Sequence, residues 1–164
     1  PILYDLGLTS YPNESLHLKV EISQHKQVSI IQKTPILLYG HSFVSAHFSL
    51  ETMMAGTMLA CLERNFQLGK EGVSVKGRDF YDLLWFMQKR IQPLEEKLQK
   101  DGSEPYTVLS AMQTLKDKIG SLKPADLAVD LLSLFEQRTF IEAWLEGFKD
   151  HFNELVKGYI YIKF

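Results

Sequence analysis

The sequence predicts an α+β fold in which a small sheet precedes a helical bundle. Apolar and polar residues alternate over residues 16–22, which is typical of a strand with one buried face. After residue 49, apolar residues recur at helical spacing through most of the chain. Hydrophobic residues make up 45% of the 164 residues and charged residues 23%, as in folded globular domains. The chain is therefore expected to bury a core of its own.

The strands are expected in the first third of the chain. In the clearest one, residues 16–22, the side chains of Lys19 and Glu21 share the polar face. Three further extended segments are expected: residues 28–31, residues 36–39 after a break at Gln32-Lys33-Thr34-Pro35, and residues 43–48. Residues 1–48 are therefore predicted to form the sheet.

Residues 49–164 are predicted to form the helical lobe. Ser49 is suited to an N-cap, and a helix is expected from Leu50 to about Phe66. Proline and glycine residues set the other boundaries. Further helices are expected over residues 78–91, 93–100, 105–120, 124–135 and 139–157. The last of these carries aromatic residues at helical spacing, which are expected to lie in the core.

Composition excludes several classes of protein. The formal net charge of −2 gives no overall attraction to nucleic acid or to anionic lipid. Cys61 is the single cysteine, which excludes an internal disulfide and a cysteine-rich zinc site and favours a reducing compartment. No apolar run approaches the roughly 20 residues that a membrane span needs. The chain opens on Pro1 and enters a strand pattern almost directly, so we expect a partial product.

The stretch Lys76-Gly77-Arg78-Asp79 begins one of the expected helices and has two interpretations. In the structural one, Asp79 complements the helix N-terminus, and Arg78 and Asp82 form a surface ion pair one turn apart. In the functional one, Lys76, Arg78 and the free backbone N–H groups of the helix start bind a phosphate. Asp79 and Asp82 would then orient the basic groups, bind a metal ion or accept a proton.

The strand that carries Lys19 and Glu21 admits the same two interpretations, a solvated face or part of a site. A metal-dependent phosphoryl transferase needs more than one carboxylate to hold magnesium against a triphosphate. The sequence contains no Asp-x-Asp, Asp-x-Glu or Glu-x-Asp. Glu21 therefore lacks the companions that such a site requires.

Several of these segments, taken in order, resemble the AbiEii-type nucleotidyltransferase toxins, a type IV toxin–antitoxin family linked to abortive infection. The family's motif runs Lys-x-x-Ala-Leu-x-x-Arg, then a basic loop, then Arg-Asp-x-Tyr-Asp. Ala60, Arg64 and the run Lys76-Gly77-Arg78-Asp79-Phe80-Tyr81-Asp82-Leu83 stand in those places, after a strand Leu18-Lys19-Val20-Glu21-Ile22. The resemblance covers about residues 16–90.

The resemblance implies a polymerase-β-like fold, with part of a nucleotidyltransferase sheet over residues 1–48 and a helical lobe over residues 49–164. The implied reaction transfers a nucleotide from a nucleoside triphosphate, with Mg²⁺, onto an acceptor such as tRNA in the bacterial cytoplasm. A cognate antitoxin is an implied partner, and a membrane is not. The implied site comprises catalytic Asp79 and Glu21, with Glu21 as a candidate metal ligand, phosphate-binding Lys19, Arg64, Lys76 and Arg78, and supporting Tyr81 and Asp82.

Two departures from the family pattern carry expectations of their own. Thr57 stands where the motif has its first lysine, so one cation is missing. The family's first acidic motifs would precede the Glu21 strand, where too few residues remain. We therefore expect a C-terminal portion of a transferase that is inactive by itself. The alternative is a degenerate, non-catalytic module that binds another protein.

Overall fold

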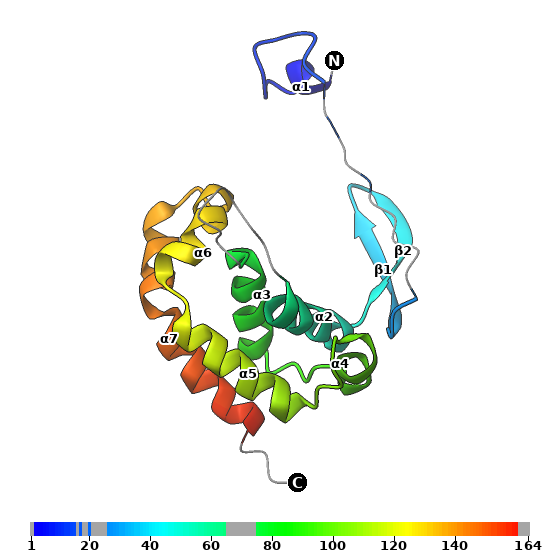
Figure 1. Cartoon of the computed structure of the whole chain (residues 1–164). Coiled ribbons are helices and arrows are strands. Elements are labelled where there is room, and N and C mark those ends of the chain that lie inside the picture. Colours follow the sequence, from blue (N-terminus) through cyan, green and yellow to red (C-terminus); the bar gives the residue numbers. More distant parts are fainter. Residues whose placement is uncertain (1, 16, 18–19, 21–25, 65–74, 161–164) are drawn as a thin grey trace.

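The computed structural model describes residues 2–15, 17, 20, 26–64 and 75–160. Within them a small antiparallel sheet precedes a set of helices, which confirms the predicted α+β fold (Figure 1). The elements are α1 (Ile2–Asp5), β1 (Ile31–Leu38), β2 (His41–Phe48), α2 (Leu50–Glu63), α3 (Gly77–Gln88), α4 (Glu95–Asp101), α5 (Val108–Ser121), α6 (Pro124–Leu131), η1 (Leu132–Leu134) and α7 (Arg138–Ile160).

The strand predicted over residues 16–22 falls mainly outside the described residues. Its two described members, His17 and Val20, are not in a strand. Lys19 and Glu21 also lie outside the described part of the chain. Their predicted positions on one polar strand face therefore stay predictions.

The sheet is a single hairpin of β1 and β2, paired from Ile31 opposite Phe48 to Leu38 opposite His41. Tyr39 and Gly40 connect the strands with positive φ angles of 49° and 77°, the conformation that suits a two-residue hairpin turn. The predicted break at residues 32–35 is wrong, because β1 runs through this segment without interruption. Proline is tolerated there because both strands of a two-stranded sheet are edge strands.

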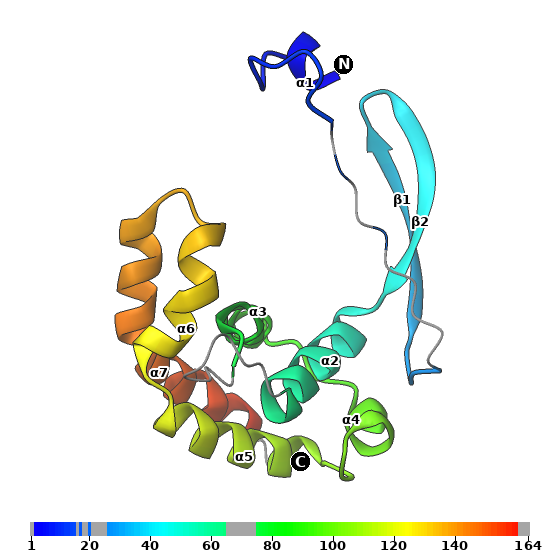
Figure 2. The ribbon, with the colours of Figure 1, turned by 45° about the horizontal axis from the view of Figure 1, so that its top comes forward.

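The base of the hairpin is joined to the helices by hydrogen bonds. The Ile30 N–H donates to Thr52 Oγ1 at 3.0 Å, and the Ser49 N–H donates to the Ile30 carbonyl at 2.8 Å. The Val28 N–H donates to the Asp101 carboxylate on α4, at 3.1 Å from Oδ2. An isolated hairpin is at best marginally stable. These contacts therefore fix where the strands leave the helical lobe, as Figure 2 shows beside α2.

The core lies among helices α2 to α7. Ser49 caps α2 as predicted, with its Oγ accepting from the Thr52 N–H at 3.3 Å. The apolar face predicted for α3 is confirmed, since Phe80 and Leu83 are buried there together with their neighbours Leu84 and Met87. The aromatic residues of α7 were predicted to lie in the core. Phe148 and Phe152 are buried, whereas Phe140 is 49% exposed.

Several helix boundaries differ from the predicted ones because of local hydrogen bonds. Helix α5 begins at Val108 rather than at Pro105, since Thr107 Oγ1 accepts from the Ser110 N–H at 3.1 Å and Ser110 Oγ accepts from the Thr107 N–H at 2.9 Å. Helix α7 extends to Ile160, three residues beyond the expected end at residue 157. None of the described helices is both long and apolar enough to cross a membrane.

Candidate functional site

The end of α2 and the first turn of α3 bring two of the predicted site residues together. Arg64 Nη1 lies 2.7 Å from Asp79 Oδ2. The Asp79 side chain is 14% exposed, whereas that of Arg64 is 44% exposed. The carboxylate is therefore held in the wall of the lobe while the guanidinium keeps access to solvent, so that Arg64 can bind an anion without leaving Asp79.

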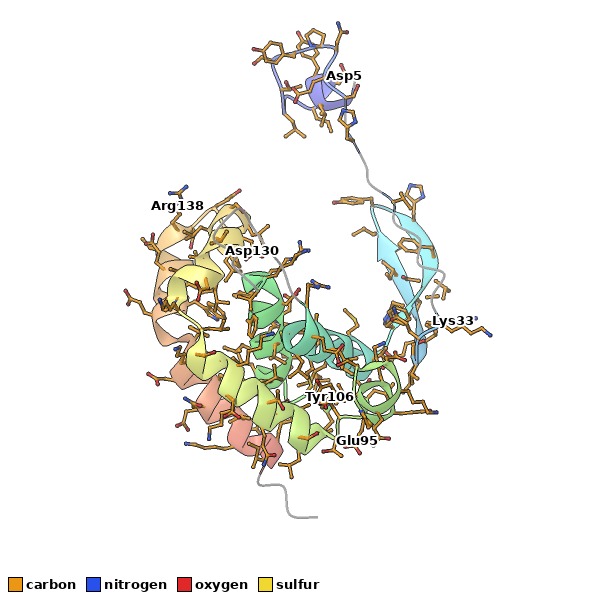
Figure 3. The ribbon with its side chains drawn as sticks, in the orientation of Figure 1. Asp5, Lys33, Glu95, Tyr106, Asp130 and Arg138 are labelled. Carbon is orange, nitrogen blue, oxygen red and sulfur yellow. The ribbon has the colours of Figure 1, made fainter. Side chains whose placement is uncertain are left out.

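The N-terminus of α3 is hydrogen-bonded to a carboxylate that the sequence did not predict. The Gly77 N–H donates to Asp130 Oδ1 at 2.7 Å, and the Arg78 nitrogen lies 3.5 Å from Asp130 Oδ2. Asp130 belongs to α6 and lies beside this end of α3 (Figure 3). A carboxylate here satisfies the helix terminus and repels a second anion. The Gly77 N–H group is thus engaged by Asp130 rather than free, and phosphate binding at this helix start stays a prediction.

Gly77 is required at this contact between α3 and α6. A Cβ atom at this position would lie 2.1 Å from the Leu127 carbonyl oxygen and 2.9 Å from Asp130 Oδ1. Only a residue without a side chain lets the two backbones approach so closely. The glycine of the Lys76–Asp79 stretch is thus explained by packing.

The predicted pairing of charges within α3 is replaced by pairing between helices. In the described residues Asp79 pairs with Arg64, and we find no ion pair between Arg78 and Asp82. Burial raises the pKa of Asp82, the nearby Asp79 carboxylate raises it further, and Arg78 opposes both effects. Asp82 is thus a carboxylate whose charge the folded state disfavours.

This shift gives a pH-dependent prediction for Asp82→Asn. A carboxyl group whose pKa is raised on folding destabilises the protein at pH values above its folded pKa, and the penalty disappears as the pH falls below the unfolded value of 3.8. The variant is therefore expected to be more stable than wild type at pH 7, by at most about 0.5 kcal/mol after solvent screening. Urea unfolding at pH 7 and pH 3.5 measures this. A gain that is larger at the acidic pH would contradict the assignment.

In the sequence, Lys76 and Tyr81 lie on either side of Arg78 and Asp79. Lys76 is the half-buried residue that precedes α3. The Tyr81 ring contacts those of Phe135 and Trp144, with centroids 5.1 and 5.2 Å away. These contacts place Tyr81 in the aromatic packing between α3 and α7.

A hollow of about 650 Å³ lies between α2, α4 and residues 26–27. Four cationic side chains line it: Lys26, Arg64, Lys97 and Lys100. Arg64 belongs both to this lining and to the ion pair with Asp79. Arg64 therefore connects the hollow to the Asp79 carboxylate on α3.

Two carboxylates also line the hollow, and both are engaged by neighbouring groups. Glu63 Oε1 accepts from the Ser103 N–H at 2.6 Å and from Ser103 Oγ at 2.9 Å. Asp101 Oδ2 accepts from Lys97 Nζ at 2.6 Å as well as from the Val28 N–H. The lining thus carries four cations and two carboxylates, and just outside it Asp79 and Glu96 pair with Arg64 and Lys100.

The described residues do not form a metal site. No group of three or more His, Cys, Asp or Glu side chains in the described ranges is arranged to hold a metal ion. Glu21, the predicted metal ligand, lies outside those ranges. The described part of the chain thus contains no metal-coordinating set of this kind.

The structure is that of an α+β protein with a hollow lined by four cationic side chains. A family model described as "Nucleotidyl transferase AbiEii toxin, Type IV TA system" matches residues 5–160. The chain belongs to this family, as the sequence motifs predicted. Neither the curated proteins nor the solved structures contain a match.

Membership of this family has general consequences for the chain. A type IV toxin–antitoxin family implies a nucleotide substrate and an antitoxin partner. Nucleotidyl transferases as a class generally use a divalent metal ion.

Sequence reasoning missed several residues of this site. Asp130, Lys97, Lys26 and Lys100 reach it from segments far from the Lys76–Asp82 stretch. Lys97 lies four residues before Asp101, but the predicted helix ended at Lys100, and such pairs are common on solvated helix faces. The others carried no local signal.

Proposed function

We propose that this protein takes part in the transfer of a nucleotide from a nucleoside triphosphate to an RNA acceptor such as tRNA. The observation that carries the proposal is the double role of Arg64, which lines the cationic hollow and pairs with Asp79. A positive group next to a held carboxylate can bind phosphate oxygens while the carboxylate orients the attacking group.

Arg64 and Asp79 have complementary tasks in this proposal. The guanidinium carries five N–H donors, of which one is engaged by Asp79 Oδ2. The remaining donors bind phosphate oxygens and stabilise the charge that develops on them. In the described part of the chain Asp79 uses only Oδ2, which leaves Oδ1 to accept a hydrogen bond from the attacking hydroxyl.

The other predicted site residues lie at the edge of the site or outside the described part of the chain. Arg78 is exposed one residue before Asp79 and contributes positive charge at the mouth of the site, with Lys76 beside it. Lys19 and Glu21 lie outside the described residues, and we propose that they also contribute to the site. In this proposal residues 1–48 form part of the transferase sheet and residues 49–164 form the helical lobe.

We infer the metal ion, the cellular compartment and the partner protein from the chemistry of the proposed reaction. Mg²⁺ is the proposed metal because it binds nucleoside triphosphates through their phosphates and a few carboxylates. The cytoplasm is the proposed compartment because tRNA and nucleoside triphosphates meet there. A cognate antitoxin would restrain the activity until infection by a phage, as the term abortive infection implies.

The test uses the protein as its gene encodes it. The protein is incubated with each of the four α-labelled nucleoside triphosphates, Mg²⁺ and total tRNA, and label in the RNA is measured. Transfer of label from at least one nucleotide is expected, and chelation of the metal should abolish it. Absence of transfer with all four nucleotides, with Mg²⁺ or Mn²⁺, would contradict the proposal.

A second candidate is a non-catalytic module that binds another protein. Two observations favour it: Thr57 stands at the position of the motif lysine, and the described residues form no metal site. In that case the protein would bind its antitoxin but leave all four labelled nucleotides unchanged. The same incubation, combined with a pull-down of the antitoxin, separates the two candidates.

A further inference from the structure

Lys97 is a buried lysine in the wall of the cationic hollow. Its relative exposure is 5%, which is unusual for a residue whose charge favours water. Its Nζ donates to Asp101 Oδ2 at 2.6 Å and to Gln27 Oε1 at 3.2 Å. An ammonium group has three donors. Within the described residues, two of them are used, so one N–H is left for a ligand in the hollow.

The methylene chain of Lys97 lies against α2 at Gly56. A Cβ atom at Gly56 would be 3.5 Å from Lys97 Cε, which is ordinary van der Waals contact. The next residue is Thr57, where the motif of the family would place a lysine on α2. Lys97, from α4, lies beside Gly56 on α2, whereas Thr57 is not among the residues that line the hollow.

Two further lysines on the lining are exposed and free to turn toward an anion. Lys100 forms an exposed pair with Glu96, with side-chain exposures of 63% and 56%, and such a pair is weak. Lys26 is exposed, and it has no ion pair with another described residue. The hollow thus combines a buried, positioned ammonium with two adaptable ones.

We propose that this hollow binds the triphosphate chain of the nucleotide, with Lys97 as its fixed cation and Lys26 and Lys100 at its rim. Arg64 connects the bound chain to Asp79. A volume of about 650 Å³ falls within the range of small-ligand pockets. The inference rests on the proposed function, because it names the place where that reaction holds its phosphates.

The test measures binding of inorganic tripolyphosphate to the full chain by isothermal titration calorimetry. The double variant Lys26→Gln/Lys100→Gln is compared with the control Lys33→Gln/Lys116→Gln, which removes the same charge from exposed positions outside the hollow (Lys33 is labelled in Figure 3). The first variant is expected to bind about tenfold more weakly, as for loss of a charged hydrogen bond. The control should bind like wild type.

Lys97 is tested by two variants with different charge. Lys97→Gln is expected to weaken tripolyphosphate binding by about tenfold or more, and Lys97→Arg, which keeps the charge, should retain most of it. Circular dichroism checks folding, since loss of the ammonium leaves Asp101 without its partner. If Lys97→Gln does not fold, the exposed double variant alone decides.

The outcomes separate the subsite from the reaction. Tripolyphosphate binding that is lost in the pocket variants supports the subsite even if no labelled nucleotide is transferred to RNA. Equal binding by wild type, pocket variants and control overturns it, and so does an equal loss in the control. A short RNA without a 5′-triphosphate is the second probe; if it binds the hollow and tripolyphosphate does not, the ligand is an RNA backbone and the proposal is wrong.

Discussion

Replacing Gly77 by alanine is expected to destabilise the protein by about 3 kcal/mol. The added Cβ would lie 2.1 Å from the Leu127 carbonyl oxygen and 2.9 Å from the Leu127 carbonyl carbon. These are backbone atoms of α6, so relief of the clash requires a shift of the helix. Such a shift also lengthens the 2.7 Å hydrogen bond from the Gly77 N–H to Asp130.

The matched control for this variant is Gly147→Ala on α7. A Cβ at Gly147 would have no atom within 4 Å, and the residue lies inside a helix. Alanine is favoured over glycine by about 1 kcal/mol at such a position, so this variant should be more stable than wild type. Urea unfolding followed by circular dichroism measures both. If the two variants are equally stable, α6 does not pack on the start of α3 as described.

Replacing Asp79 by asparagine is expected to slow nucleotide transfer by about 100-fold or more. Asparagine has nearly the same shape, but it carries no charge to hold Arg64 and is a poor proton acceptor. The Michaelis constant for the nucleotide should change much less than kcat, since the cations of the hollow remain. Because the partner Arg64 is 44% exposed, the free energy of unfolding should fall by less than about 1 kcal/mol.

The control for Asp79→Asn is Asp117→Asn, an exposed carboxylate on α5 that is outside the site. This variant should transfer label at the wild-type rate. A transfer rate that is the same for Asp79→Asn and Asp117→Asn would remove Asp79 from the site. A loss of activity that accompanies unfolding would instead assign Asp79 to the stability of the lobe.

Local sequence patterns predicted the features that depend on local physics. The apolar face of α3 follows from spacing of three and four residues, and the cap of α2 follows from a serine directly before the apolar run. Both are present, in Phe80 and Leu83 and in Ser49. The order of a small sheet before helices followed from the change in periodicity near residue 49.

The sequence could not predict features that depend on packing between helices. The cap of α3 comes from Asp130, which is 53 residues away from Gly77 along the chain. The pairing of Arg64 with Asp79 depends on how α2 and α3 lie together, and a pair at Arg78 and Asp82 was the nearer alternative. No spacing rule connects such residues.

The continuous strand β1 was missed for a different reason. Gln32-Lys33-Thr34-Pro35 is polar and contains proline, which predicts a turn between buried strands. In the structure this segment belongs to a hairpin with both strands at an edge, where most side chains are exposed. An exposed strand does not need alternation, and proline at an edge breaks no ladder between interior strands.

The central claim is that Arg64 and Asp79 act as one unit in nucleotide transfer, and a double-mutant cycle on the transfer rate tests it most directly. Rates of label transfer to tRNA are measured for wild type, Arg64→Gln, Asp79→Asn and the double variant. The account predicts that each single change costs about 100-fold and that the double variant is little slower than either one. Losses that multiply in the double variant, or single variants with the wild-type rate, would contradict it.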